Sequence, residues 1–307
     1  MVREKTEAIG EAVEEEPRGP SDLKLAGRML LRSPPALFGL LCVLIVVCWA
    51  LMPGLFSPLD PLDQDLGRYL KPPGYEDASG NVYWLGTDKH GRDILSRIIW
   101  GSRISLFVGI AAVIVSGLVG VTLGLLAGYL GGYVDAVISR IIDSALSIPF
   151  ILLALSIVAI LGPSLRNVII AIAVRTWIVY ARVIRGGVMA LKEFDYVMGA
   201  KAAGCRTPRI LMRYLLPNVL SPAIVIATLY LGRMIIIEAS LSFLGMGVPP
   251  PTPTWGGMLA DGRAFLDTAW WLALFPGLAI MFTVLGVNLL GDWVRDALDP
   301  QLMHSVE

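Results

Sequence analysis

The chain has 307 residues and a mass of 33.2 kDa, with 55% hydrophobic and 16% charged residues. Ordinary soluble domains carry about 25% charged residues, so this composition, with a mean hydropathy of +0.69, excludes most soluble folds and indicates a membrane protein. The 25 basic and 25 acidic residues balance, which argues against a nucleic-acid partner. Cys42, Cys48 and Cys205 have neither disulfide-framework nor metal-site spacing.

The chain begins with a polar, charged segment. Residues 1–35 include the acidic run Glu14–Glu16 and a break rich in proline and glycine, unlike the short basic start of a cleaved signal peptide. We expect a cytoplasmic N-terminal tail with the acidic run in solvent. The apolar block from Ala36 to about Leu55 follows, and about 20 such residues are needed to cross a membrane, so this block is the first predicted span.

Residues 57–103 form a region rich in proline and aspartate between the first two spans. Between residues 91 and 100, isoleucine and leucine recur at helical spacing with arginine and aspartate between them, and Trp100 follows. This pattern predicts a short interfacial helix with Trp100 at headgroup level. The simpler alternative is an amphipathic lead-in to the second span, because nothing in the pattern requires a ligand.

The second predicted span lies within residues 104–134, which carry no charge and end in the glycine-rich turn 128–132. Gly120, Gly124 and Gly128 repeat at four-residue spacing on one face of this helix. Small residues let helices approach closely in lipid, so we expect a seam for helix packing rather than a substrate contact.

The third predicted span covers about residues 136–161 and contains Pro149, which a membrane helix tolerates as a kink. Gly162–Pro163 is expected to end it. Arg140 and Asp143 are three positions apart and face the same side, so we expect them to pair with each other near the inner interface.

Three further apolar blocks predict the fourth, fifth and sixth spans, at about residues 167–188, 219–246 and 268–291. Arg175 interrupts the fourth span, and Arg233 and Glu238 interrupt the fifth. An ionisable group near the bilayer centre costs about 2.5–3.5 kcal/mol on insertion scales, so we expect these three residues to line or brace a pathway. The alternative is a structural salt bridge between helices.

The loop between the fourth and fifth spans fixes the orientation. Residues 182–213 contain seven arginines and lysines against two acidic residues, and basic loops lie in the cytoplasm. Six spans then place both termini inside, and residues 57–103 and the proline-rich loop 247–267 outside.

Motifs for catalysis are missing from the sequence. No lysine follows a glycine, so the chain has no G-x-x-x-x-G-K-[ST] phosphate loop and is not expected to hydrolyse ATP. H-E-x-x-H and G-x-S-x-G are also absent. His90 and His304 fall on opposite sides of the predicted membrane, so we expect no metal site, no cofactor and no catalytic set.

Four stretches together resemble the permease subunits of ATP-binding-cassette importers for peptides and nickel, of the dipeptide and oligopeptide permease C type. They cover residues 84–97 (WLGTDKHGRDILSR), 241–251 (LSFLGMGVPPP), 288–300 (NLLGD…RDALDP) and the basic loop. The resemblance implies an all-α integral membrane protein of the cell inner (plasma) membrane with six transmembrane helices. Its permease domain would cover residues 36–302, followed by a C-terminal tail at 303–307.

The basic loop carries the most informative part of the resemblance. The family pattern there is Glu-Ala-Ala, three residues, Gly, nine residues, Ile, one residue, Leu-Pro. In this chain the Glu, one Ala and the Ile are replaced, and the positions are taken by Met198, Gly199, Ala200, Gly204, Tyr214, Leu216 and Pro217. Residues 196–203 favour a helix, Gly204 can end it in a left-handed conformation, and Pro208 can start a second short helix. The resemblance implies that this knob, within residues 190–217, docks into an ATPase subunit.

The resemblance also implies the partners and the activity. The chain would be a translocation subunit that pairs with a second permease of similar fold, is driven by two ATPase subunits and receives substrate from an extracytoplasmic solute-binding protein. Peptides, nickel chelates and oligosaccharides are substrates of such importers, and the sequence leaves the choice open. An ion-coupled carrier would show internal repeats, and none is convincing here. A membrane-embedded enzyme lacks its catalytic set.

Overall fold

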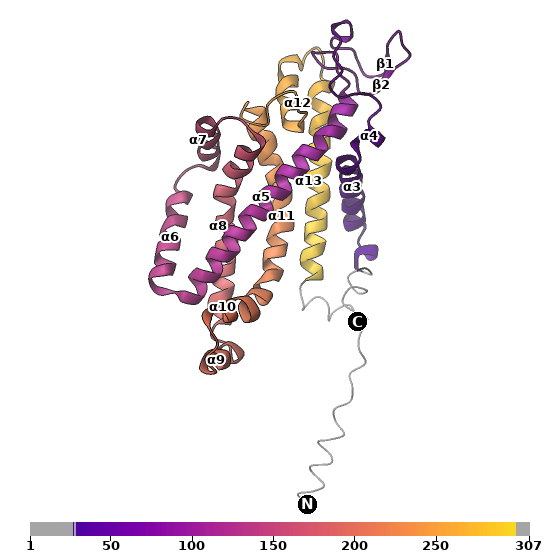
Figure 1. Cartoon of the computed structure of the whole chain (residues 1–307). Helices are drawn as coiled ribbons and strands as arrows, with labels where there is room; N and C mark the ends of the chain where they lie inside the picture. The colour runs from indigo at the N-terminus through magenta and orange to yellow at the C-terminus, as the bar shows by residue number, and fades with distance from the viewer. Residues whose placement is uncertain (1–26, 28, 299–307) are drawn as a thin grey trace, which may run out of the picture.

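The computed structural model describes residue 27 and residues 29–298. Helices make up most of this part of the chain (Figure 1), with one two-stranded antiparallel sheet near the N-terminal end. The principal elements are α3 (Pro34–Leu51), α4 (Pro53–Phe56), β1 (Tyr75–Glu76), β2 (Val82–Tyr83), α5 (Ile94–Leu130), α6 (Gly132–Leu146), α7 (Phe150–Leu161), α8 (Leu165–Leu191), α9 (Asp195–Ala202), α10 (Thr207–Ile210), a π-helical turn (Leu211–Leu215), α11 (Leu216–Phe243), α12 (Trp255–Gly262) and α13 (Trp271–Ala297).

Five of the described helices, α3, α5, α8, α13 and the one that contains α11, are long and apolar enough to cross a membrane. The bent pair α6–α7 makes a sixth candidate. These elements correspond to the six predicted spans, and the all-helical class is confirmed.

The third span differs from its prediction. We expected a kink at Pro149, but α6 and α7 meet at 91° and Pro149 caps α7 from outside the helix. Proline cannot donate the helical hydrogen bond and disfavours helical geometry in the residue before it, so the helix ends instead of bending. At the other end, Gly162 has φ = +85° and closes α7 as predicted.

At the start of α5 the predicted interfacial helix is wrong, and the alternative, a lead-in to the second span, is confirmed. Residues 94–100 continue directly into α5 and form no separate interfacial helix. Ile94, Ile98 and Ile99 are at most 3% exposed, because they lie beneath other protein elements instead of at a water boundary. Asp93 caps the helix by accepting hydrogen bonds from the Ser96 N–H and hydroxyl. Burial raises the pKa of the Asp93 carboxyl, although these hydrogen bonds oppose that effect.

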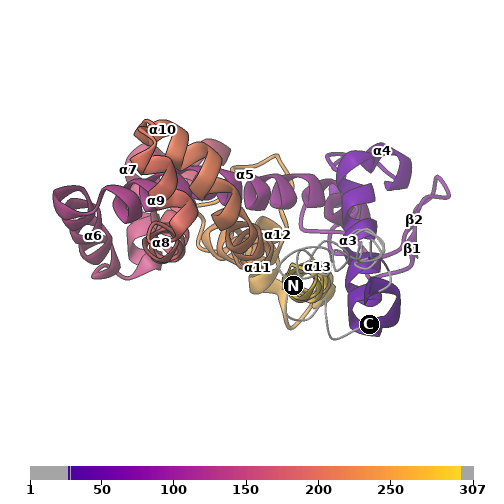
Figure 2. The same ribbon diagram turned by 90° about the horizontal axis from the view of Figure 1, so that it is seen from below.

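The long helices form a layered bundle. Figure 1 shows α5 running diagonally across α8, α11, α13 and α3, and Figure 2 shows those four helices in a row. The predicted glycine seam lies where α5 meets α8: a Cβ atom on Gly124 would lie 2.8 Å from the Ala181 carbonyl oxygen, and one on Gly128 would lie 2.8 Å from Val188 Cβ. The seam therefore packs helices within this subunit, as predicted.

The predicted pair between Arg140 and Asp143 is wrong. Asp143 instead lies 3.3 Å from Arg182 of α8, and Asp135 forms a bidentate pair with Arg185 at 2.5 and 2.6 Å. These ion pairs connect α6 to α8, whereas the predicted pair would have joined two residues within α6.

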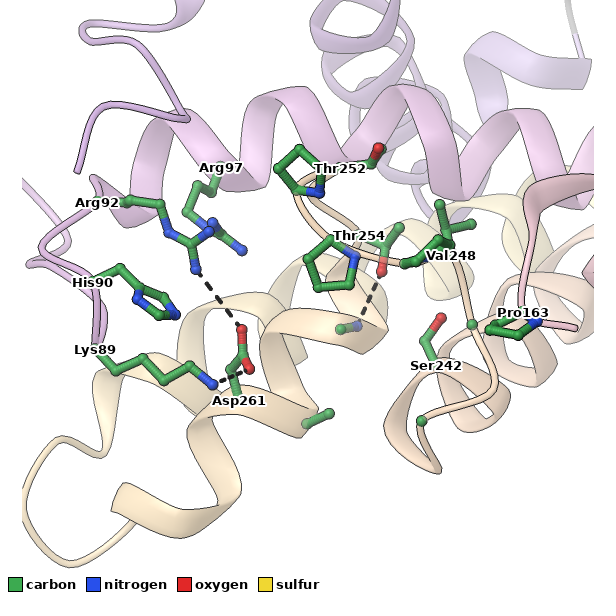
Figure 3. A pocket seen from close by; sticks show the side chains of 17 residues that line it. Lys89, His90, Arg92, Arg97, Pro163, Ser242, Val248, Thr252, Thr254 and Asp261 are labelled. Carbon is green, nitrogen blue, oxygen red and sulfur yellow. Dashed lines mark hydrogen bonds and ion pairs between the residues drawn. The ribbon is translucent and has the colours of Figure 1, made fainter.

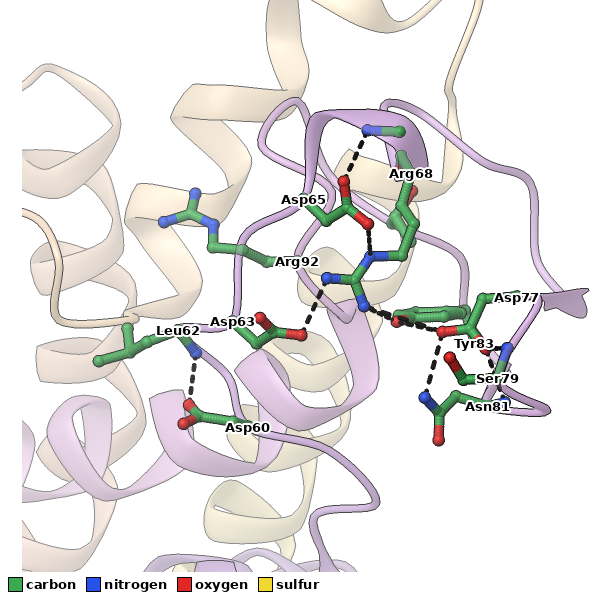
Figure 4. A network of polar contacts seen from close by, with 12 residues as sticks. Asp60, Leu62, Asp63, Asp65, Arg68, Asp77, Ser79, Asn81, Tyr83 and Arg92 are labelled. Atoms are coloured by element: carbon green, nitrogen blue, oxygen red, sulfur yellow. Dashed lines mark hydrogen bonds and ion pairs between the residues drawn. The ribbon is translucent and has the colours of Figure 1, made fainter.

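Residues 57–93 form an ordered lobe at the end of the bundle opposite α9 and α10 (Figure 1). Figure 4 shows its polar centre, the Arg68 side chain, which is held by Asp63 at 2.9 Å, Asp65 at 3.3 Å and the hydroxyl of Tyr83. We call this end, which also holds the loop 247–254 and α12, the outer end. This arrangement agrees with the orientation derived from the basic loop.

Candidate functional site

The basic loop folds as two short helices joined at Gly204, here called the knob (α9, residues 203–206 and α10). Gly204 has φ = +80°; its N–H donates to Lys201 O at 3.0 Å, and the N–H of Cys205 donates to Ala200 O at 3.0 Å. These two bonds form a Schellman motif, which ends a helix at a left-handed residue. Pro208 lies in the first turn of α10. The predicted helix, turn and second helix are all confirmed.

The knob has a buried side and an exposed side. Val197 and Ile210 of the knob are buried and join a core cluster that contains Leu125 of α5, Ile184 of α8 and Val219 of α11. On the exposed side, Tyr196 and Met198 of α9 are more than 40% exposed, as are Phe194, directly before α9, and Met212, two residues after α10. The rings of Phe194 and Tyr196 lie 6.0 Å apart, and exposed large apolar side chains that lie together are typical of an interaction site.

The six predicted coupling residues do not all lie on the exposed side of the knob. Met198 and Gly199 lie on the exposed surface of α9, whereas Ala200 is buried. Leu216 and Pro217 begin α11, directly after the π-helical turn that connects α10 to it. The knob is therefore continuous with a long helix that crosses the bundle.

The predicted pathway residues are not brought together. Glu238 is fully buried in α11 and accepts hydrogen bonds from the hydroxyls of Ser242 at 2.8 Å and Ser105 at 3.2 Å. Arg233 is exposed, with its guanidinium 5.5 Å from the ring centre of Tyr230. Arg175 of α8 is partly buried, and its Nε has no hydrogen-bond partner. Within the described residues, none of the three takes part in an ion pair, which disfavours the structural salt bridge.

The outer end contains a pocket of about 410 Å³ that the sequence did not indicate. Its charged lining is Lys89 and Arg92 from the segment before α5, Arg97 from the start of α5, and Asp261 from α12, with His90 beside them (Figure 3). The opposite lining is the loop 247–254, which contains three consecutive prolines, together with Pro163. We call this the outer pocket.

Two tryptophans hold the walls of the outer pocket in place. Trp255 of α12 is fully buried and donates from Nε1 to the Ile98 carbonyl at 2.9 Å, and Trp271 donates from Nε1 to the Thr87 carbonyl at 3.2 Å. Residues 247–267 were expected only as an outer loop, yet they include α12. Threonine is a residue type that often begins a helix, so Thr254 was a signal for the start of α12. In the structure its hydroxyl accepts a hydrogen bond from the Gly257 N–H as the N-cap.

Comparison with known proteins shows which family this multi-span helical protein represents. Residues 120–304 match the family described as binding-protein-dependent transport system inner membrane component, and the chain belongs to that family. It is 44% identical over 286 residues to the di/tripeptide transport system permease protein DppC of Pseudomonas aeruginosa, covering 93% of this chain and 94% of that protein.

Further relatives are similar over nearly the same length. The dipeptide transport system permease protein DppC of Alkalihalophilus pseudofirmus is 42% identical over 90% of this chain and 89% of that protein, and the one of Escherichia coli K12 is 44% identical over 88% and 90%. A solved inward-facing structure of the MetNI methionine ABC transporter has a TM-score of 0.47 and 21% identity, covering 63% of this chain and 94% of that one. The resemblance to ATP-binding-cassette importer permeases is confirmed by the family match and these identities.

Proposed function

We propose that the chain is a translocation subunit of an ATP-driven importer of dipeptides and short oligopeptides in the cell inner membrane. The observation that carries the proposal is the 44% identity, across nearly the whole chain, to permeases named for dipeptide and di/tripeptide transport. A second permease of similar fold, two ATPase subunits and a solute-binding protein complete the proposed assembly. Family membership supports this kind of assembly.

The knob is proposed to be the ATPase docking element. Its exposed apolar side offers a contact surface, and its buried side joins α5, α8 and α11 in one core cluster. Because a packed cluster moves as a unit, displacement of the knob would move the inner ends of all three helices. Met198 and Gly199 would contact the ATPase, Ala200 and Gly204 would hold the shape of the knob, and Leu216 and Pro217 would connect it to α11.

The intramembrane polar residues are proposed to border the translocation pathway. Arg233 has its cationic group exposed on α11, and Arg175 has an unused guanidinium donor on α8. Glu238 lies on α11, where two serine hydroxyls satisfy it. We propose that the arginines face permeant solute or water and that Glu238 braces α11 against α5.

Reconstitution tests the proposal directly. The full chain, its co-purifying permease and ATPase subunits, and the binding protein are placed in proteoliposomes, and uptake of a radiolabelled dipeptide is measured against nickel–histidine and an oligosaccharide. ATP-dependent dipeptide uptake supports the proposal. Uptake of the nickel chelate or the oligosaccharide alone would reassign the substrate, and uptake by the single chain driven by an ion gradient would indicate a carrier.

The same uptake measurement tests the role of the arginines. Dipeptide uptake that persists unchanged in Arg175→Ala and Arg233→Ala would contradict their place on the translocation pathway.

A further inference from the structure

We infer that the outer pocket binds a carboxylate, and that this carboxylate is the C-terminal group of the peptide on its way into the translocation pathway. The inference rests on the proposed function for the identity of the solute.

The charges around the outer pocket do not cancel. Lys89, Arg92 and Arg97 contribute three positive charges, and Asp88 and Asp261 contribute two negative ones. Two ion pairs are close: Lys89 Nζ lies 2.7 Å from Asp261 Oδ1, and Arg92 Nε lies 2.7 Å from Asp88 Oδ2. Two are longer: Arg97 Nη1 lies 3.5 Å from Asp88 Oδ2, and Arg92 Nη2 lies 4.0 Å from Asp261 Oδ2. Three cations against two carboxylates leave a net charge of +1, so the pocket suits a ligand with a single negative charge.

Arg97 is the most weakly paired of the three cations, because Asp88 is already occupied by other donors. The Asp88 carboxylate accepts the backbone N–H groups of His90 at 2.8 Å and Arg92 at 3.0 Å, in addition to Arg92 Nε. Arg97 Nη1 lies 3.5 Å from the same carboxylate and makes no hydrogen bond. The Arg97 side chain lines the pocket but is only 6% exposed, and its Nη1 is shielded from bulk water. A buried guanidinium nitrogen without a hydrogen bond is costly, and a carboxylate bound against the Arg97 side chain would add acceptors beside this group.

The chemistry of the pocket favours a carboxylate on a small organic molecule. Figure 3 shows the guanidinium groups of Arg92 and Arg97 next to each other, and planar guanidinium groups match a carboxylate through parallel hydrogen bonds. The prolines 249–251 and Val248 form an apolar wall across from these cations. A peptide end offers both features, a carboxylate for the arginines and an adjacent side chain for the apolar wall. The volume of about 410 Å³ is within the range of small-molecule sites.

Two partly exposed residues allow the charge of the pocket to be changed in both directions. The side chains of Lys89 and Asp261 are 34% and 33% exposed, so neutral substitutions there should leave the buried frame intact. Lys89→Gln lowers the net charge of the pocket by one, and Asp261→Asn raises it by one. Arg97→Gln removes the most weakly paired cation, and Arg97→Lys retains its charge without the planar fork.

The test measures equilibrium binding of radiolabelled Ala-Phe, and of its C-terminal amide, to the assembled transporter in nanodiscs without the binding protein. We expect Lys89→Gln to weaken binding of the free acid by about three- to tenfold and Asp261→Asn to strengthen it, because charges a few ångströms apart interact appreciably near a protein surface. Arg97→Gln should weaken it by at least about tenfold, and Arg97→Lys by less. The amide should bind weakly to every variant.

Several outcomes would overturn the inference. If Lys89→Gln and Asp261→Asn shift binding in the same direction, the ion pair between them matters as structure and not as charge. Equal affinity for acid and amide would exclude a carboxylate ligand. If the peptide is unaffected but docking of the purified binding protein follows the charge series, the carboxylate belongs to that protein's surface. Dipeptide uptake by the wild-type transporter is measured in parallel, so failure of the site and failure of the proposed function remain distinguishable.

Discussion

At the scale of single residues, Gly124 sets how closely α5 and α8 approach. A Cβ atom there would lie 2.8 Å from the Ala181 carbonyl oxygen and 2.9 Å from Ile184 Cβ, distances that force the helices apart. We expect Gly124→Ala to destabilise the folded chain by about 1–3 kcal/mol, the usual cost of overpacking a close contact. The measurement is the midpoint of thermal unfolding of the purified chain in detergent.

Gly117 provides a matched control on the same helix. A Cβ atom there would meet only the Tyr180 ring, at 3.6 Å, which is an ordinary van der Waals contact. Gly117→Ala should therefore leave the unfolding midpoint unchanged or raise it, because alanine favours a helix by up to about 1 kcal/mol over glycine. Equal midpoints for the Gly117 and Gly124 variants would show that the seam does not control helix approach.

Asp77 makes the outer hairpin sensitive to acid. Hydrogen bonds from the Asn81 and Ser79 backbone N–H groups to its carboxylate hold the pKa of Asp77 below its ordinary value of 3.8. A lowered folded-state pKa adds stability that is complete above the unfolded pKa and is lost as pH falls through the folded pKa. We expect protection of residues 77–83 from hydrogen exchange, corrected for intrinsic rates, to be constant above about pH 4 and to fall below it. Asp77→Asn cannot titrate, so its corrected protection should not fall in that range.

At this scale the sequence predicted conformation better than contacts. Gly204 was predicted to be left-handed from local pattern alone, and its φ of +80° agrees. The partners of Asp143 and the burial of Arg97 depend on which helices lie side by side, and no local pattern encodes that. The contact of Trp255 could not be predicted for the same reason, since its hydrogen-bond acceptor, the Ile98 carbonyl, is 157 positions away in the chain.

At the scale of elements, the knob depends on one turn. Gly204→Val would place a β-branched residue at φ = +80°, which is unfavourable by about 1–2 kcal/mol and would misdirect α10. We expect this variant to insert into the membrane but to lose dipeptide uptake and co-purification of the ATPase subunits. Gly204→Asn should retain most of both, because asparagine tolerates left-handed geometry.

Substitutions of charged residues on the knob test whether its function depends on its shape or on its surface charge. Lys201 and Arg209 are exposed and form no ion pair within the described part of the chain. Exposed charges contribute about 0–1 kcal/mol, so Lys201→Ala and Arg209→Ala should reduce uptake and ATPase co-purification far less than Gly204→Val. Equal loss in all three variants would contradict a knob organised by its turn.

The sequence identified the helices of the bundle, but it did not show that the third span is divided into α6 and α7 or how α5 begins. Hydropathy finds apolar length, and α6–α7 together have that length, so the 91° corner at Pro149 was read as a kink. The start of α5 looked amphipathic because arginine and aspartate alternate with isoleucine. In the structure those charged groups are buried among other protein groups of the outer end, a possibility that single-helix periodicity does not distinguish from an interfacial position.

At the scale of the whole molecule, the chain is expected to depend on separate subunits for its energy. The sequence has no phosphate loop, and in phosphate loops the backbone N–H groups and a lysine hold the nucleotide. The purified chain in liposomes should therefore hydrolyse ATP no faster than protein-free liposomes. Addition of the two ATPase subunits and the second permease should restore hydrolysis, and the binding protein with dipeptide should increase it. Gly204→Val should leave this assembly without stimulated hydrolysis, since the knob no longer fits. Steady ATP turnover by the highly purified single chain would contradict the proposal that separate subunits hydrolyse ATP for the transporter.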